Sequence, residues 1–148
     1  MRKVINWLKY VFRRYTWAEL LKLSNSPKDI CFHVRCGMQY VSDAEGFDEH
    51  ETGRDAWKRG YGDCEDFAAC VRNACDDKGF IASMIILQES YGDHTAHAVV
   101  LGNVDGRRWV SSNGSFAWCK NREDCFRKVM RSMRWKSYYV MPRGTNLM

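Results

Sequence analysis

The sequence predicts an α+β fold in which a central helix with a cysteine at its start packs on an antiparallel sheet. Residues 64–77 have apolar side chains at helical spacing, with Phe67 and Val71 on one face. Residues 80–87 are apolar and rich in β-branched residues, so we expect a buried strand there, and two further strands are expected at 96–103 and 107–112. The dipeptide Asp105-Gly106 between the last two is typical of a tight hairpin turn. A helix followed by antiparallel strands makes the predicted class α+β.

The length and composition are those of one globular domain, which we place at residues 1–148. A chain of 148 residues, with 45% hydrophobic and 28% charged residues, can bury a core but is too short for most multi-domain enzymes. This composition excludes disorder, collagen and a bare coiled coil. Within the domain we expect a basic amphipathic helix in residues 1–25 and the core of the fold in residues 40–141.

The segments before the central helix are predicted from periodicity and from turn residues. Residues 3–22 place apolar side chains on one helical stripe, and the Ser24–Pro27 segment ends that helix. Residues 30–41 are typical of extended chain, and residues 42–56 of an acidic loop.

Capping residues set the ends of the other elements. Asp63 is the expected N-cap of the central helix, with Asp66 in the position of a capping-box acid, and Gly79 ends the helix. A last helix is expected at 121–133 and a final strand at 135–141.

The net charge of +5 is unevenly distributed. Residues 1–22 and 120–148 are basic, whereas acidic residues crowd between Asp43 and Asp77. Such basic ends could contact nucleic acid or an anionic membrane, and they could equally form an ordinary solvated surface.

The seven cysteines and the lack of a secretory leader favour free thiols in a reducing compartment, so we expect a cytoplasmic protein. No apolar stretch is long enough to span a membrane. A zinc site is not expected because the chain has no Cys-x-x-Cys pair. A viral origin or an association with virions stays open.

Cys64 stands at the first turn of the predicted helix, where a thiol can act as a nucleophile. The positive end of a helix lowers a thiol pKa, and the backbone N–H groups of its first turn can bind an oxyanion. Asp63 and Glu65 would raise that pKa, so a base is required. The alternative is that Cys64 is one more small buried residue.

His97 is the best candidate base because it begins an apolar strand that can hold an imidazole rigidly. The sequence has three other histidines: His33, His50 and His94. Asn113 follows the return strand of the hairpin and can lie beside His97, where its amide would orient the ring.

Three motifs together resemble the transglutaminase-like cysteine peptidase superfamily, and most of all its small bacterial transglutaminase-like cysteine proteinases. Residues 57–68, Trp-x-x-Gly-x-Gly-Asp-Cys-Glu-Asp-Phe-Ala, are similar to the nucleophile motif. Residues 97–100 resemble the histidine strand, and residues 109–113 resemble the segment of the third catalytic residue. That residue is usually Asp, whereas this chain has Asn113, with Ser112 as the alternative third member.

The resemblance implies a papain-like fold and a cysteine-dependent hydrolase of peptide or carboxamide bonds in proteins, acting through an acyl-enzyme. Proteolysis, deamidation and transamidation share that intermediate, so all three stay open. The expected partner is a protein or peptide substrate, with no small-molecule cofactor. Candidates for binding the oxyanion or positioning the substrate are Trp57, Tyr61 and Gln39.

Calcium is a weaker expectation, because some relatives use it at this acidic stretch. Asp63 and Glu65, with Asp43 or Asp48, offer the hard oxygen ligands that calcium prefers. Two other functions remain as alternatives: a cell-wall peptide hydrolase, and a non-catalytic module that keeps the fold and binds protein or nucleic acid.

Overall fold

The computed structural model describes residues 14–42, 52–90 and 95–141. Its centre is a five-stranded antiparallel sheet with the strand order β6-β5-β4-β3-β7. The strands are β3 (Ile81–Glu89), β4 (Ala96–Val104), β5 (Arg107–Ser112), β6 (Ser115–Cys119) and β7 (Tyr138–Val140). A separate parallel ladder joins β1 (Gln39–Tyr40) to β2 (Tyr61–Gly62).

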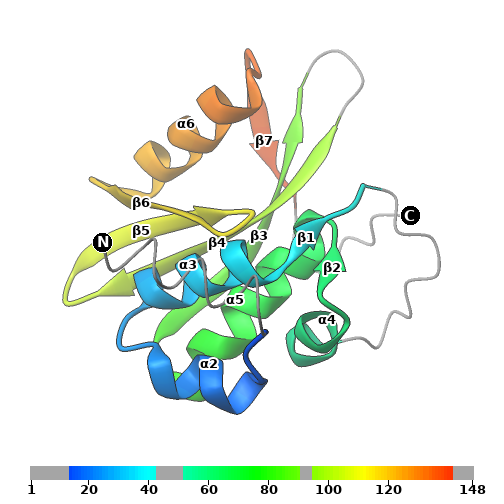
Figure 1. Ribbon diagram of the computed structural model, residues 1–148. Coiled ribbons are helices and arrows are strands. Elements are labelled where there is room, and N and C mark those ends of the chain that lie inside the picture. The colour runs from blue at the N-terminus through cyan, green and yellow to red at the C-terminus, as the bar shows by residue number, and fades with distance from the viewer. Residues whose placement is uncertain (1–13, 43–51, 91–94, 142–148) are drawn as a thin grey trace.

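Helices lie on both sides of the large sheet (Figure 1). On one side are α2 (Trp17–Leu23), α3 (Pro27–Gly37), α4 (Gly53–Arg59) and α5 (Cys64–Lys78), and on the other is α6 (Arg122–Met133). The central helix α5 packs against β3, β4 and β5 and also against α3 and α4. The predicted α+β class, with a cysteine-bearing helix on an antiparallel sheet, is therefore confirmed.

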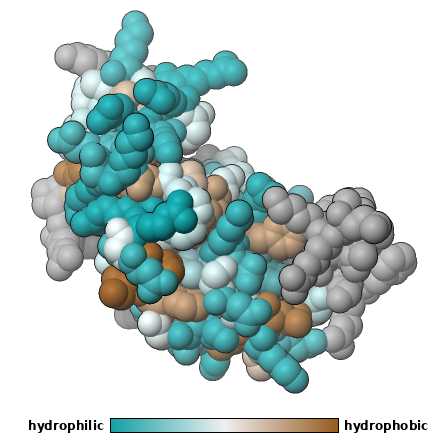
Figure 2. Space-filling model, turned by 90° about the vertical axis from the view of Figure 1, so that its left-hand side faces the viewer, coloured by the Kyte–Doolittle hydropathy of each residue, from teal (hydrophilic) through white to brown (hydrophobic). Residues whose placement is uncertain are grey.

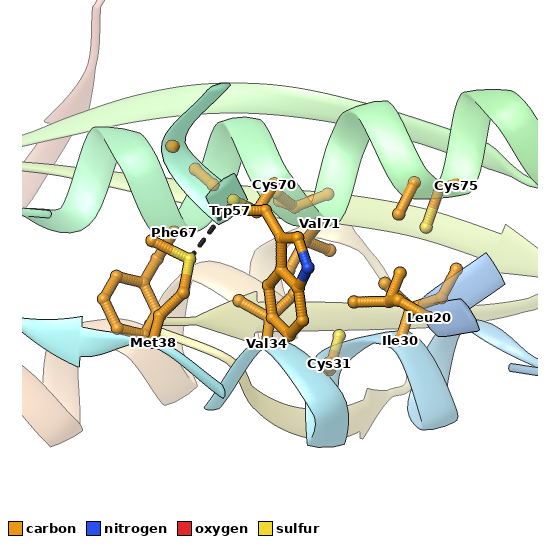
Figure 3. Close-up of a cluster of buried hydrophobic side chains, with 14 of the residues drawn as sticks. Leu20, Ile30, Cys31, Val34, Met38, Trp57, Phe67, Cys70, Val71 and Cys75 are labelled. Carbon is orange, nitrogen blue, oxygen red and sulfur yellow. Dashed lines mark hydrogen bonds between the residues drawn. The ribbon is translucent and has the colours of Figure 1, made fainter. Parts of the chain in front are cut away.

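Two apolar clusters fill the two sides of the sheet. On the α5 side, Leu20, Ile30 and Val71 are fully buried, and the side chains of α3 and α5 meet there (Figure 3). On the α6 side, Leu87 and Val99 of the sheet pack with apolar residues of α6. The outer face of α6 is polar, and hydrophilic side chains dominate the upper part of the view in Figure 2.

Both ends of α5 agree with the prediction. Asp63 is the N-cap, since its carboxylate accepts hydrogen bonds from the N–H groups of Glu65 and Asp66 at 3.0 and 3.4 Å. Gly79 ends the helix in the left-handed conformation, with φ of +78°.

The long strands of the sheet are joined by two hairpins of the same type. Asp105 and Gly106, with φ of 51° and 82°, join β4 to β5 as predicted. Asn113 and Gly114, with φ of 49° and 81°, join β5 to β6. Positive φ at both central residues is the signature of a two-residue hairpin turn whose twist matches the strands. The sequence analysis missed β6, although its Asn-Gly dipeptide is also a hairpin signal.

The prediction that residues 30–41 are extended is wrong over most of its length, because α3 occupies Pro27–Gly37. The Ser26 hydroxyl accepts the N–H of Asp29 at 3.2 Å, and Pro27 fits the first helical turn, where its missing N–H costs nothing. The Ser-Pro pair that ends one helix therefore also starts the next.

Three other boundaries differ from the predictions. Within the described residues a helix begins at Trp17, where Thr16 and Glu19 form a capping box, so the helix predicted over 3–22 is interrupted at residues 14–16, while residues 1–13 lie outside the described residues. The predicted loop 42–56 contains the start of α4, capped by Thr52, while residues 43–51 lie outside the described residues. The final strand covers only Tyr138–Val140.

Candidate active site

Cys64 is the first residue of α5 and follows β2 directly. A reciprocal pair of hydrogen bonds fixes this entry, because the Asp66 carboxylate accepts the N–H of Asp63 at 2.8 Å while Asp63 caps the helix. Gly62 has to be glycine, since a Cβ there would lie 2.2 Å from an Asp66 carboxylate oxygen. Arg59 is 3.5 Å from the other oxygen of Asp66. The backbone before Cys64 is therefore fixed by the Asp63–Asp66 hydrogen bonds, and Arg59 in turn pairs with the Asp66 carboxylate.

The Cys64 thiol is half-buried and faces the start of β4. The backbone N–H of Ala98, the residue after His97, is placed to donate a hydrogen bond to the thiolate form of Cys64. Burial raises the pKa of the thiol above its usual value, Asp63 and Glu65 raise it further, and the Ala98 hydrogen bond partly opposes them. Cys64 is therefore a neutral thiol at neutral pH, and it needs a base to become a nucleophile.

His97 is 3% exposed, and its imidazole Nε2 lies 2.7 Å from the hydroxyl oxygen of Ser112. Burial lowers the pKa of His97, so the ring is neutral at neutral pH and can accept a proton. The ladder between β4 and β5 ends at the Val100–Ser111 pair, so His97 and Ser112 face each other where the two strands separate.

Cys64 and His97 are neighbours without being hydrogen-bonded to each other in the described part of the chain. The thiol lies against β4 at Ala98, one residue beyond His97, and the Ser112 hydroxyl is the hydrogen-bond partner of the imidazole. Catalytic hydrogen bonds are often long in structures without substrate and shorten in the substrate complex. The arrangement therefore contains a thiol, a neutral imidazole and a hydroxyl that orients it, all at one end of the β4–β5 pair.

Among the described residues, the hydrogen-bond partner of the imidazole is Ser112 and not Asn113. Asn113 occupies the first position of the β5–β6 hairpin, and its side-chain oxygen is buried without a hydrogen-bond partner. The turn packs on α3, since a Cβ on Gly114 would lie 2.7 Å from the Cβ of Arg35. The structure thus brings Ser112, the alternative third member, to His97. The Asn-Gly turn signal could have shown from sequence that Asn113 belongs to the turn.

The three candidates for oxyanion binding differ in their surroundings. Gln39 and Tyr61 are exposed and lie opposite each other in the β1–β2 ladder, just before the Cys64 helix. Trp57 is 2% exposed, and its indole N–H donates to the carbonyl of Tyr15 at 2.9 Å. The Trp57 donor is therefore already used in the core, whereas Gln39 and Tyr61 have side chains that can face a ligand.

Of the four carboxylates proposed for calcium, Asp63 and Glu65 lie within the described residues. Asp63 caps α5, and among the described residues no group of three or more His, Cys, Asp or Glu side chains gathers in a way that could hold a metal ion. Asp43 and Asp48 lie outside the described residues, as do the histidines His50 and His94.

His33, which the sequence analysis weighed as a candidate base, is structural. It lies on α3, is 5% exposed and packs edge-on against the rings of Tyr15 and Phe32. Burial lowers the pKa of His33, so the ring is neutral in this setting.

Comparison with known proteins supports the fold and leaves the family open. No protein-family model and no curated protein matches the sequence. Among solved structures, the fold is similar to that of “a putative cysteine protease” from Cytophaga hutchinsonii, with a TM-score of 0.53 and 14% sequence identity. The match covers 95% of this chain but 57% of the other, so the chain spans little more than half of that protein's length. In the part of the chain that the structure describes, no helix is long and apolar enough to cross a membrane.

Proposed function

We propose that this chain is a cysteine-dependent hydrolase of peptide or carboxamide bonds in proteins, similar in mechanism to the transglutaminase-like cysteine peptidases. The observation that carries the proposal is the placement of Cys64 at a helix start, against the backbone next to His97, whose ring is held by Ser112. The fold likeness to the structure described as “a putative cysteine protease” supports the same class.

The two neutral groups define the first step. When Nε2 of His97 donates its proton to the Ser112 hydroxyl, Nδ1 carries a lone pair and can accept the Cys64 proton. The thiolate then attacks the substrate carbonyl carbon, and the electron pair of the C=O bond moves onto the oxygen. His97 returns the proton to the leaving amine as the C–N bond breaks, which leaves an acyl group on Cys64.

Water completes the cycle by the same route in reverse. His97 takes a proton from water, the hydroxide attacks the thioester, and the Cys64 thiol is released with the acid product. Gln39 and Tyr61 border the site and supply side-chain donors for the oxyanion. If an amine attacks in place of water, the result is transamidation. If the leaving group is ammonia, the result is deamidation.

A proteome-derived peptide mixture incubated with the protein in H₂¹⁸O tests the proposal. Hydrolysis adds ¹⁸O to new carboxyl groups, both in cleaved peptides and in deamidated side chains, so mass spectrometry identifies the bond class. Cys64→Ser is the control because it keeps the size of the side chain. We expect labelled products from the wild type alone; the absence of products from the wild type, or equal products from Cys64→Ser, would overturn the assignment.

A further inference from the structure

Arg14 joins the ends of two helices that precede the candidate site. Its Nε donates to the carbonyl of Gly37, the last residue of α3, at 2.8 Å. Its two other nitrogens donate to the carbonyls of Trp57 and Lys58, in the last turn of α4. The guanidinium also lies over the Trp57 ring, 4.8 Å from the centroid. One side chain thus bridges segments that are 23 and more than 40 residues away in sequence.

The chemistry of helix ends explains why an arginine stands here. The last carbonyls of a helix have no partner within the helix, and they form the negative end of its dipole. Two such ends meet at one point, where a planar cation with several fixed N–H donors satisfies both. A lysine has the charge but not the fork, so it could not make the same set of hydrogen bonds.

The two helices that Arg14 joins lead directly into β1 and β2. The N–H of Gln39 donates to the carbonyl of Gly60, and the N–H of Val41 donates to the carbonyl of Gly62, both at 2.9 Å. Gly60 is left-handed, with φ of +88°, and a Cβ there would lie 2.8 Å from the Arg14 guanidinium. The register of this ladder is therefore set where Arg14 holds the two helix ends.

The ladder in turn leads to the nucleophile. Gly62 is followed by Asp63, the N-cap of α5, and then by Cys64. Gln39 and Tyr61, the exposed pair just before the Cys64 helix, belong to the same ladder. Loosening the helix ends would therefore shift the backbone that presents Cys64 and both candidate oxyanion donors.

We propose that Arg14 is a positioning residue for the active site, which acts through the β1–β2 ladder without touching substrate. This inference rests on the proposed function. The nucleophile motif does not contain Arg14, and no residue near it in sequence points to the role.

Two measurements on the full chain test the role, with Arg14→Ala, Arg14→Lys and, as control, Arg72→Ala. Arg72 is an exposed arginine on α5 that pairs with Asp76. The first measurement is amide hydrogen exchange by NMR. In Arg14→Ala we expect exchange at Gln39 and Val41 to be faster by about tenfold, because their acceptors are no longer fixed, while β3 and β4 stay within about twofold of wild type.

The second measurement is the rate of Cys64 alkylation by iodoacetamide, taken as the ratio between about pH 6.5 and about pH 9.5. Proton transfer from Cys64 to His97 raises the alkylation rate at the lower pH, and it depends on where the thiol lies relative to the imidazole. We therefore expect Arg14→Ala to lower the ratio of the rate at the lower pH to the rate at the higher pH by about fivefold. Arg14→Lys should give a ratio between those of Arg14→Ala and the wild type. A variant that is less stable but remains folded at both pH values should keep the wild-type ratio.

Each outcome decides the matter. Unchanged exchange at Gln39 and Val41 overturns the bridging role, and faster exchange with an unchanged alkylation ratio overturns the positioning role. If wild-type Cys64 reacts no faster than the half-buried Cys119, the proposed function itself fails and there is no reactive thiol to position. If Arg72→Ala matches Arg14→Ala in both measurements, the effect is one of charge and the inference is wrong.

Discussion

Helices α5 and α6 begin in the same way on opposite sides of the sheet, yet only one of them carries a candidate site. Each has a capping residue, Asp63 or Asn121, that accepts an N–H from the first turn. Each also has an aspartate in the third helical position, Asp66 or Asp124, whose carboxylate accepts a backbone N–H from the entering chain at 2.8 or 2.9 Å. Local sequence therefore builds the same helix start twice.

The difference lies in what surrounds the two starts. The first residue of α5 is Cys64, which directly follows β2 and lies against β4, whereas the first residue of α6 is the exposed Arg122. The Asp66 side chain is 6% exposed and that of Asp124 is 19% exposed. Burial raises the pKa of Asp66 to about 7, while the backbone N–H of Lys120 lowers the pKa of Asp124. Burying polar groups costs free energy unless those groups form hydrogen bonds. A helix start becomes a candidate site when it is buried against such polar groups.

The largest expected effect is the difference between substitutions of Cys64 and Cys125, the cysteines in the first turns of α5 and α6. Cys64→Ser should lower turnover by at least about a thousandfold, because a hydroxyl is a far weaker nucleophile than a thiolate. Cys125→Ser, on the buried side of α6, should leave turnover within about twofold and lower the free energy of unfolding by about 1–3 kcal/mol, because it buries a hydroxyl among apolar groups.

Steady-state assays and urea unfolding of both variants make this comparison. Equal loss of turnover in Cys125→Ser at full folding would show that chemistry is not confined to the α5 side.

A smaller effect should distinguish the two neighbours at the end of β5. Ser112→Ala removes the hydrogen-bond partner of Nε2, so we expect turnover to fall by about ten- to a hundredfold. Asn113→Ala should keep turnover within about threefold but lower the free energy of unfolding by about 1 kcal/mol, since Ala tolerates the φ of 49° less well than Asn. The two variants should be assayed for turnover and for unfolding. A dead Asn113→Ala beside an active Ser112→Ala would make Asn113 the partner of His97.

The smallest effect concerns the two aspartates and the pH dependence of stability. The pKa of Asp66 is raised from 3.8 to about 7 in the folded protein, so the folded state binds more protons than the unfolded state between those values. Stability should therefore fall as pH rises through this window, and Asp66→Asn should flatten that slope. Asp124 has the opposite sign: its lowered pKa contributes stability that is present above 3.8 and lost in acid.

Urea unfolding at a series of pH values for Asp66→Asn and Asp124→Asn measures both slopes. If Asp66→Asn keeps the wild-type slope between pH 3.8 and about 7, burial does not govern this carboxyl in the way described.

Local signals were sufficient to predict much of the fold. The start of α5 at Cys64 and its end at Gly79 follow from capping residues next to the helix, and the hairpin at Asp105-Gly106 follows from a dipeptide. The error at α3 has a local cause as well, since Ser26-Pro27 was treated as an interruption when it is also an N-cap and a first turn.

The site depended on contacts that sequence patterns do not contain. Residue types and motifs singled out Cys64 and His97. The choice between Ser112 and Asn113 depends on a shift of one residue along the strand, and the β5–β6 hairpin determines it by placing Asn113 in the turn. The buried partner of the Trp57 indole and the role of Arg14 could not be foreseen, because their contacts join segments more than 20 residues apart.

The pH dependence of Cys64 alkylation in wild type and in His97→Ala tests the central claim most directly. The raised thiol pKa and the lowered imidazole pKa make both groups neutral, so wild-type alkylation should rise through the His97 pKa, below 6.5, and rise again only as free thiolate forms above pH 9.0. His97→Ala should keep the second rise and lose the first. Identical profiles for the two proteins would show that His97 does not act on Cys64, and would contradict the account.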